Sequence, residues 1–401
     1  MSEQIFFAKS LNLLSDTDAQ YLAPAHNGNV SSAFGRRVWP AAGNFTKMRV
    51  RLAVAPGAGK SRTFTLRKLT GAGRSVPGTA TALTLTISGT DTTGEAVIDA
   101  AISPGDVIVI ECSPTSTPAL SRVQITTTFV PTTANETVLL GGIVAGTVTR
   151  WIPFYALAGT LTSEDRGKLP LPTPGTFKNL YIDADDTSGS GNSRTITVRK
   201  NGTSTALAAT MGAASDAASN TSDSFTGAID DLLSMQLDIT GTPSSNAVRV
   251  AMVFVPDNSG EFLSGIACGQ DQHTTGLLYG PFHGSFATGA DGDAEVKVDQ
   301  LALDITILKM YAHLEVAPGS GNSRTFTFRK NGTSSPMAVT VSDANITGNY
   351  TTPLGASLDQ LISTTEDTSG SPTTSSLTIS YLVKAEAFAE TAKHRFFALF
   401  D

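Results

Sequence analysis

Apolar and polar residues alternate along a stretch that occurs three times in the chain. The copies are APGAGKSRTFTLRK at 55–68, TSGSGNSRTITVRK at 187–200 and APGSGNSRTFTFRK at 317–330. In each copy the apolar side chains fall on one face of the stretch and the threonines fall on the other, a period of two that is typical of a half-buried β-strand. The residues that we expect in the core are Phe64, Leu66, Ile196, Val198, Phe326 and Phe328.

An Asn-Gly pair follows two of the copies, in KNGT at 200–203 and at 330–333. This pair favours a tight β-hairpin because both turn residues must adopt positive φ, so we place Gly202 and Gly332 at turn positions. The first copy has KLTG at 68–71 instead, and we expect a longer loop there.

Other segments recur with the same spacing. YLAP, WIPF and YGPF begin at 21, 151 and 279, and the apolar segments SRVQITTTFVP, NAVRVAMVFVP and SSLTISYLVKAE end at 131, 256 and 386. Self-similarity at a fixed period indicates tandem copies of one domain. We therefore predict an all-β chain of three tandem antiparallel domains, at 1–132, 133–258 and 259–386, and an apolar C-terminal tail at 387–401.

Composition narrows the function classes. With 37 glycines, 19 prolines and 16% charged residues among 401, the chain favours short strands and tight turns, with short helical turns expected at 229–235 and 357–363. The net charge is −7 and no basic tract is present, so a nucleic-acid partner lacks its electrostatic footprint. The apolar run at 138–148 is too short to span a bilayer, and no secretory signal is seen at the N-terminus.

No motif for catalysis or for a cofactor is found. The first copy resembles the end of a phosphate-binding loop, but Val54 occupies the first glycine position and Lys60 is replaced by Asn192 and Asn322 in the other copies. The histidines have no metal-binding spacing, and the acidic clusters at 183–186 and 291–295 are interpreted as solvated turns rather than calcium loops. We expect no cofactor, no metal and no enzymatic activity, although carboxylates from distant strands could still form a glycosidase pair.

The motif, its hairpin, the segment ISPGDVIVIECSPTSTP at 102–118 and the closing FVP strand together resemble a domain of tailed-bacteriophage virion proteins. The resemblance covers each unit from the motif to the closing strand, and the second and third copies lack SPGD. It implies a jelly-roll-like antiparallel β-sandwich. Three fused copies suggest either a compact monomer with pseudo-threefold symmetry or a string of independent domains.

The resemblance also implies a role. We expect a non-enzymatic virion structural protein, assembled in the host cytoplasm, that decorates a capsid or head surface by rigid display and contacts other virion proteins. The alternative is a receptor-binding or glycan-binding adhesin of a tail fibre, in which Trp39, Trp151 and Tyr279 would be exposed stacking platforms. A polysaccharide-degrading enzyme is a third class.

The C-terminal tail carries the apolar sequence FFALF at 396–400. Phe396, Phe397 and Phe400 are too apolar to remain in water, so we expect them to supply a closing strand within the chain. The other interpretation is that they dock on a partner by strand addition.

Overall fold

The computed structural model describes residues 3–10, 13–24, 26–28, 36–69, 76–145, 148–155, 161–244, 247–268, 277–285 and 299–386. Nearly all regular structure in these ranges is β-strand, with one 3-10 helix, η1 (Asp165–Gly167). The strand pairs are antiparallel except for two short parallel pairs, β1 with β3 and β20 with β22. The predicted class, an all-β fold of packed antiparallel sheets, is confirmed.

Residues 4–131 form two sheets, ordered β3-β1-β10-β5-β8 and β2-β9-β6-β7, with β4 beside β9. Their strands are β1 (Gln4–Ser10), β2 (Gln20–Leu22), β3 (His26–Gly28), β4 (Arg37–Val38), β5 (Gly43–Leu52), β6 (Gly57–Leu69), β7 (Thr79–Gly89), β8 (Thr93–Ile102), β9 (Val107–Thr115) and β10 (Val123–Pro131).

Residues 137–256 form two more, ordered β11-β19-β14-β17 and β12-β18-β15-β16, with β13 beside β18. Their strands are β11 (Thr137–Ala145), β12 (Arg150–Ile152), β13 (Leu169–Pro170), β14 (Gly175–Ala184), β15 (Ser193–Lys200), β16 (Thr203–Met211), β17 (Ala217–Gly227), β18 (Leu232–Thr240) and β19 (Ala247–Pro256).

Residues 261–385 form the last two, ordered β22-β20-β30-β24-β27 and β21-β29-β25-β26, with β28 beside β24 and β23 beside β29. Their strands are β20 (Glu261–Cys268), β21 (Leu278–Gly280), β22 (Gly284–Ser285), β23 (Asp299–Gln300), β24 (Ile305–Leu314), β25 (Gly319–Lys330), β26 (Thr333–Asp343), β27 (Thr347–Tyr350), β28 (Leu354–Ala356), β29 (Leu361–Ser369) and β30 (Leu377–Ala385).

The three segments, called units 1, 2 and 3 below, share one topology. If the eight strands common to the units are numbered in chain order, the two sheets of each unit run 1-8-3-6 and 2-7-4-5. This is the strand order of a jelly roll, in which two four-stranded sheets face each other across a core. The predicted core residues Phe64, Ile196 and Phe326 are fully buried, as are their partners two positions later.

The predicted hairpins are confirmed and their asparagines have a second role. Lys200 pairs with Thr203 across the turn, and Asn201 and Gly202 have φ of 51° and 79°. The Asn201 side-chain oxygen also accepts a hydrogen bond from the backbone N–H of Leu232 at 2.8 Å, where β18 begins. In unit 1, β6 ends at Leu69 and β7 begins at Thr79, so the two strands are farther apart in the chain than in the other units, as expected.

The expected helical turns at 229–235 and 357–363 are wrong. Both segments form a tight turn and then enter a strand, β18 or β29. The Asp231 carboxylate accepts from the Ala228 N–H at 2.8 Å, and the Gln360 amide oxygen accepts from the Ser357 N–H at 2.9 Å. These side chains close the turn locally, and the residues that follow pair with the motif strand instead of continuing a helix.

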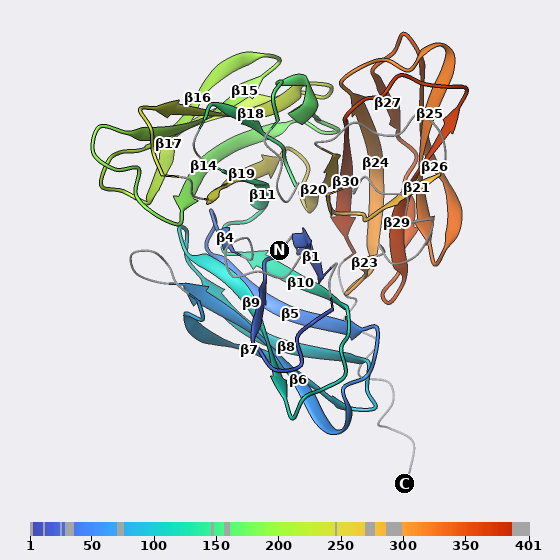
Figure 1. Ribbon diagram of the computed structural model, residues 1–401. Coiled ribbons are helices and arrows are strands. Elements are labelled where there is room, and N and C mark those ends of the chain that lie inside the picture. Colours follow the sequence, from blue (N-terminus) through green and yellow to red (C-terminus); the bar gives the residue numbers. More distant parts are fainter. Residues whose placement is uncertain are drawn as a thin grey trace.

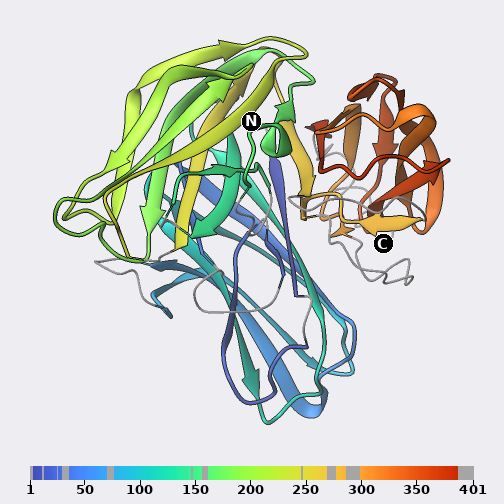
Figure 2. The ribbon, with the colours of Figure 1, turned by 45° about the horizontal axis from the view of Figure 1, so that its top comes forward.

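The units contact one another in a cycle. Strand β10 of unit 1 contacts β23 of unit 3, β30 of unit 3 contacts β13 of unit 2, and β19 of unit 2 contacts β4 of unit 1. Figure 1 shows the three bodies grouped around β1, and they stay distinct when the view is turned in Figure 2. Because β10, β19 and β30 hold equivalent places in their sheets, the same pair of surfaces is used three times, which is the arrangement that pseudo-threefold symmetry requires.

Apolar side chains cross these interfaces at equivalent positions. Ile5 of β1 joins the core of unit 3, Val138 of β11 joins the core of unit 1, and Leu263 of β20 joins the core of unit 2. Each is at most 2% exposed. The core of every unit is therefore completed by its neighbour. These contacts favour the compact monomer over the string of independent domains.

Candidate functional site

The first arginine of the repeated motif is buried in each unit and bonds to backbone carbonyl groups of loops. Arg62, Arg194 and Arg324 are fully buried. Arg62 donates from Nη1 to the carbonyl oxygen of Ser15 at 2.7 Å and from Nη2 to that of Ala119 at 2.8 Å, which ties together two loops distant in the chain. The sequence analysis assigned no role to this arginine, although its recurrence in every copy was the available signal.

In units 2 and 3 the second motif arginine lies against the aromatic residue in the middle of strand 2 of the unit. Arg199 stands over the Trp151 ring at 5.3 Å from its centroid, and Arg329 stands over the Tyr279 ring at 5.5 Å. Both rings are half-buried. A guanidinium on an aromatic face is a stabilising cation–π arrangement, and it occupies one of the two faces on which a sugar would stack.

The third aromatic candidate, Trp39, is fully buried, so it does not supply the exposed stacking platform that the adhesin alternative would need. Its ring packs at 4.9 Å from Phe6 and Phe45 and at 5.1 Å from Phe129, centroid to centroid. Strands β1, β5 and β10 bring these rings together. Trp39 is therefore the centre of the unit 1 core.

Hydroxyl groups at equivalent positions form hydrogen bonds across two of the interfaces between units. Thr126 of β10 donates to the carbonyl oxygen of Gln300 in β23, and Ser380 of β30 donates to that of Pro170 in β13. The two donors occupy equivalent positions in their strands. Thr126 lies three residues before Phe129, which pairs with Phe45 beside a register shift, and Ser380 lies three residues before Val383, which pairs with Ile307 beside a register shift. Ala251 holds this position in unit 2, where the contact is apolar instead.

A buried histidine lies where the three units meet. The ring of His283, in unit 3, packs at 5.0 Å from the ring of Tyr155 in unit 2 and at 6.4 Å from Phe6 in unit 1. Its Nδ1 lies 3.0 Å from the Ser264 hydroxyl. Burial, with a smaller contribution from the positive charge of Arg37, lowers the pKa of His283 to about 3. The imidazole is therefore neutral at physiological pH and packs as a structural ring.

Charges differ from one interface to the next. Lys9 of unit 1 faces Asp299 of unit 3 at 3.8 Å, and both side chains are nearly buried. Burial raises the pKa of Asp299, while Lys9 and two backbone N–H groups favour its ionised form. Arg36 of unit 1 instead binds Asp185 of unit 2 at 3.0 Å. The two interfaces of unit 1 therefore carry different charged pairs.

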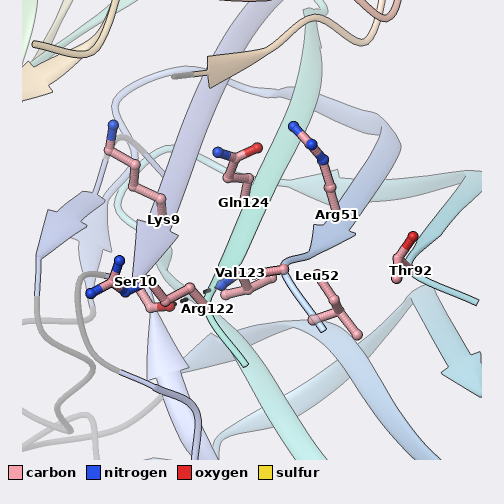
Figure 3. A pocket seen from close by; sticks show the side chains of 9 residues that line it. Lys9, Ser10, Arg51, Leu52, Thr92, Arg122, Val123 and Gln124 are labelled. Carbon is pink, nitrogen blue, oxygen red and sulfur yellow. Dashed lines mark hydrogen bonds between the residues drawn. The ribbon is translucent and has the colours of Figure 1, made fainter. Parts of the chain in front are cut away.

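A pocket lined by two arginines and a lysine lies on the outward face of sheet β1-β10-β5. It has a volume of about 360 Å³ and is lined by Lys9, Ser10, Arg51, Leu52, Ala53, Thr92, Arg122, Val123 and Gln124. Figure 3 shows the Lys9, Gln124 and Arg51 side chains standing side by side on the three strands. No carboxylate is among the lining residues.

Chemistry of other kinds is not found in the described ranges. They contain no group of three or more histidine, cysteine, aspartate or glutamate side chains placed to hold a metal ion. They also contain no helix long and apolar enough to cross a membrane. The tail residues Phe396, Phe397 and Phe400 and the acidic segment at 291–295 lie outside the described residues.

Comparison with known proteins leaves the family of this chain open. A scan against protein-family models finds no match, and a search of curated proteins finds no significant match.

Proposed function

We propose that the chain is a non-enzymatic structural protein of a virion, a capsid decoration or head-surface protein that acts by rigid display and by reinforcing the lattice. The observation that carries the proposal is the closed cycle of three jelly rolls within one chain, because it presents the shape of a trimer from a single polypeptide. Such an object fits a threefold or quasi-threefold position, where three equivalent lattice contacts are available.

The interior of the molecule supports a mechanical role. The interfaces combine shared apolar cores with buried polar bonds such as Thr126 to Gln300 and Ser380 to Pro170. Interfaces packed like domain cores resist relative motion of the units. The jelly roll is used by viral capsid domains and also by lectins, so the fold by itself is an analogy that suits both the structural function and the glycan-binding alternative.

Electron cryomicroscopy of particles that carry this protein tests the proposal. We expect one three-lobed density at regular positions of the capsid shell, and we expect that density to be missing from otherwise identical particles made without the gene. Density only at a tail tip or along a fibre would overturn the proposal in favour of the adhesin.

A glycan array tests that alternative directly. Trp151 and Tyr279 are the half-buried rings that could still contact a sugar at their edges. If the protein is an adhesin, the double variant Trp151→Ala and Tyr279→Ala should lose more than about tenfold in affinity, since stacking and its hydrogen bonds contribute at least about 1.4 kcal/mol. The control is Tyr350→Ala, which removes a half-buried ring of β27 outside this set.

A further inference from the structure

The pocket on sheet β1-β10-β5 has more positive charge than its surroundings balance. Lys9, Arg51 and Arg122 line it, and Asp299 lies 3.8 Å from Lys9 and offsets part of this charge. Among the described residues Arg51 and Arg122 form no ion pair. Two guanidinium groups are thus left without a counter-charge at the rim of a cavity, where a bound anion would be attracted strongly.

An unpartnered polar group lies between the cations. Gln124 pairs in register with Lys9 on one side and with Arg51 on the other. Its side-chain oxygen is buried and has no hydrogen-bond partner in the part of the chain that the structure describes. Because rotation of the amide exchanges its N–H₂ and its oxygen, the group can donate to a ligand in the same place. A buried polar atom without a partner is costly, so a ligand or water that bonds to it would stabilise the site.

The other two units show what normally fills this position. By strand register, Arg51 of unit 1 corresponds to Asp183 of unit 2 and to His313 of unit 3. Two residues further on, Ala53 corresponds to Asp185 and to Glu315.

Those carboxylates meet cations from the neighbouring unit. In unit 2, Asp185 bonds to Arg36 of unit 1 and to Arg249. In unit 3, Glu315 bonds to Arg166 of unit 2 at 3.0 Å. Unit 1 has an arginine and an alanine where unit 2 has two acids, so its pocket has cations and space where the other units have a carboxylate.

We propose that this pocket binds an oxyanion, a carboxylate or phosphate group held by Arg51 and the Gln124 amide, with Lys9 and Arg122 adding positive charge to the lining. Guanidinium groups pair with planar and tetrahedral oxyanions through two N–H donors at once, which makes such bonds stronger than neutral ones. The chemistry is the same for free inorganic phosphate and for an acidic side chain of another protein. This proposed site does not rest on the virion function proposed above.

Titration calorimetry of the full chain with inorganic phosphate, and separately with succinate, tests the site and distinguishes the two sources. Binding of phosphate alone indicates a phosphate group, and binding of succinate indicates a carboxylate such as an acidic side chain. Arg51→Gln should weaken binding at least about tenfold, because a charge-assisted hydrogen bond is lost. The matched control is Arg150→Gln, which removes a half-buried guanidinium on β12 of unit 2 that is not among the lining residues.

A second variant makes the test independent of lost packing. Ala53→Glu supplies the carboxylate that Glu315 provides in unit 3, and it should abolish binding while the chain stays folded, since Ala53 is exposed. Binding that is unchanged in Arg51→Gln and in Ala53→Glu would overturn the proposal.

A further control tests whether carboxylates of the same chain occupy the pocket in place of a ligand. The variant for this control neutralises the acidic segment at 291–295 by Asp291→Asn, Asp293→Asn and Glu295→Gln. Equal binding by this variant and by the unaltered chain supports an exchangeable site. The absence of binding in the unaltered chain, whether or not this variant binds, would overturn the proposal, and binding by the variant alone would show that the chain fills the pocket itself.

Discussion

Arg324 and Glu366 form an ion pair in which neither side chain is exposed to solvent. Glu366 lies opposite Phe326 in the neighbouring strand, and this position holds Cys112 in unit 1 and Leu237 in unit 2. The motif arginine is thus buried in all three units, and of the three residues at this strand position only Glu366 is acidic. The carbonyl groups of the adjacent loop are the shared feature, as in the bond from Arg324 to Thr373 at 2.9 Å.

Arg324→Met should therefore destabilise the protein more than Glu366→Leu. The first change leaves a buried carboxylate without its counter-charge, which costs about 3–5 kcal/mol. The second recreates the arrangement of unit 2, where Leu237 occupies the position and the arginine is still buried. Urea unfolding measures both free energies, with Lys200→Met as a control because its pair with Asp231 is partly exposed and contributes about 1 kcal/mol or less. If Arg324→Met and Glu366→Leu lower the free energy of unfolding equally, the bonds from the arginine to the loop carbonyl groups are not its main contribution.

Phe7→Ala should loosen unit 3, although Phe7 belongs to unit 1. Its ring joins the unit 3 core and packs 6.1 Å from the Phe282 ring. Removing a buried phenyl ring costs about 3–5 kcal/mol because a cavity remains. We expect limited proteolysis to cut within 261–385 sooner than in the unaltered protein. Leu358→Ala, at an exposed position of unit 3, should leave the cleavage rate unchanged, and cleavage confined to unit 1 in Phe7→Ala would show that the units are independent.

Gly265→Val should disrupt the contact between units 2 and 3. A Cβ atom at Gly265 would lie 2.5 Å from the Ile379 carbonyl oxygen and 2.9 Å from the Tyr155 ring, closer than atoms can approach. The backbone or the Tyr155 ring must then move, and overpacking of this kind costs about 1–3 kcal/mol. Gly355→Ala is the control, because a Cβ atom there has no neighbour within 4 Å. A midpoint of urea unfolding that is unchanged in Gly265→Val would disprove the close packing.

Acid should destabilise the protein through its buried histidines. The pKa of His283 is lowered from 6.5 to about 3, so the folded state binds fewer protons than the unfolded state between these values. Its stabilising contribution is complete above pH 6.5 and is lost progressively as the pH falls toward 3, by about 1.4 kcal/mol per pH unit. Urea unfolding at pH 7, 6 and 5 should show a shallower pH dependence in His283→Gln than in the unaltered protein.

His313 offers a second and independent readout of the same effect. Burial, and then the charge of Lys168, lowers its pKa to about 4, against the opposing influence of Asp165 and Glu315. His313→Gln should therefore also flatten the pH dependence, with a window between about 6.5 and 4. If neither variant changes the slope, the histidines are hydrated and the interfaces are looser than described.

Local patterns were sufficient for the strands and hairpins and insufficient for the aromatic residues. Phe64 and Leu66 alternate with threonines, and this alternation alone fixes which face is buried. Trp39 and Trp151 both stand beside a proline or an apolar residue, yet one is fully buried and the other is half-buried under Arg199. What separates them is the position of Phe6 and Phe129, which come from opposite ends of unit 1.

The sequence by itself determined the all-β class, the turns at Asn201 and Asn331 and the buried face of each motif strand, because period and turn chemistry act between near neighbours in the chain. Only the tertiary structure decided which outward-facing residues become buried. Thr126 and Ser380 occupy positions that alternation assigns to solvent, and a unit more than a hundred residues away covers them. The same contacts leave the cations of unit 1 around an open pocket, since no short-range pattern records which side chains a distant strand will bring together.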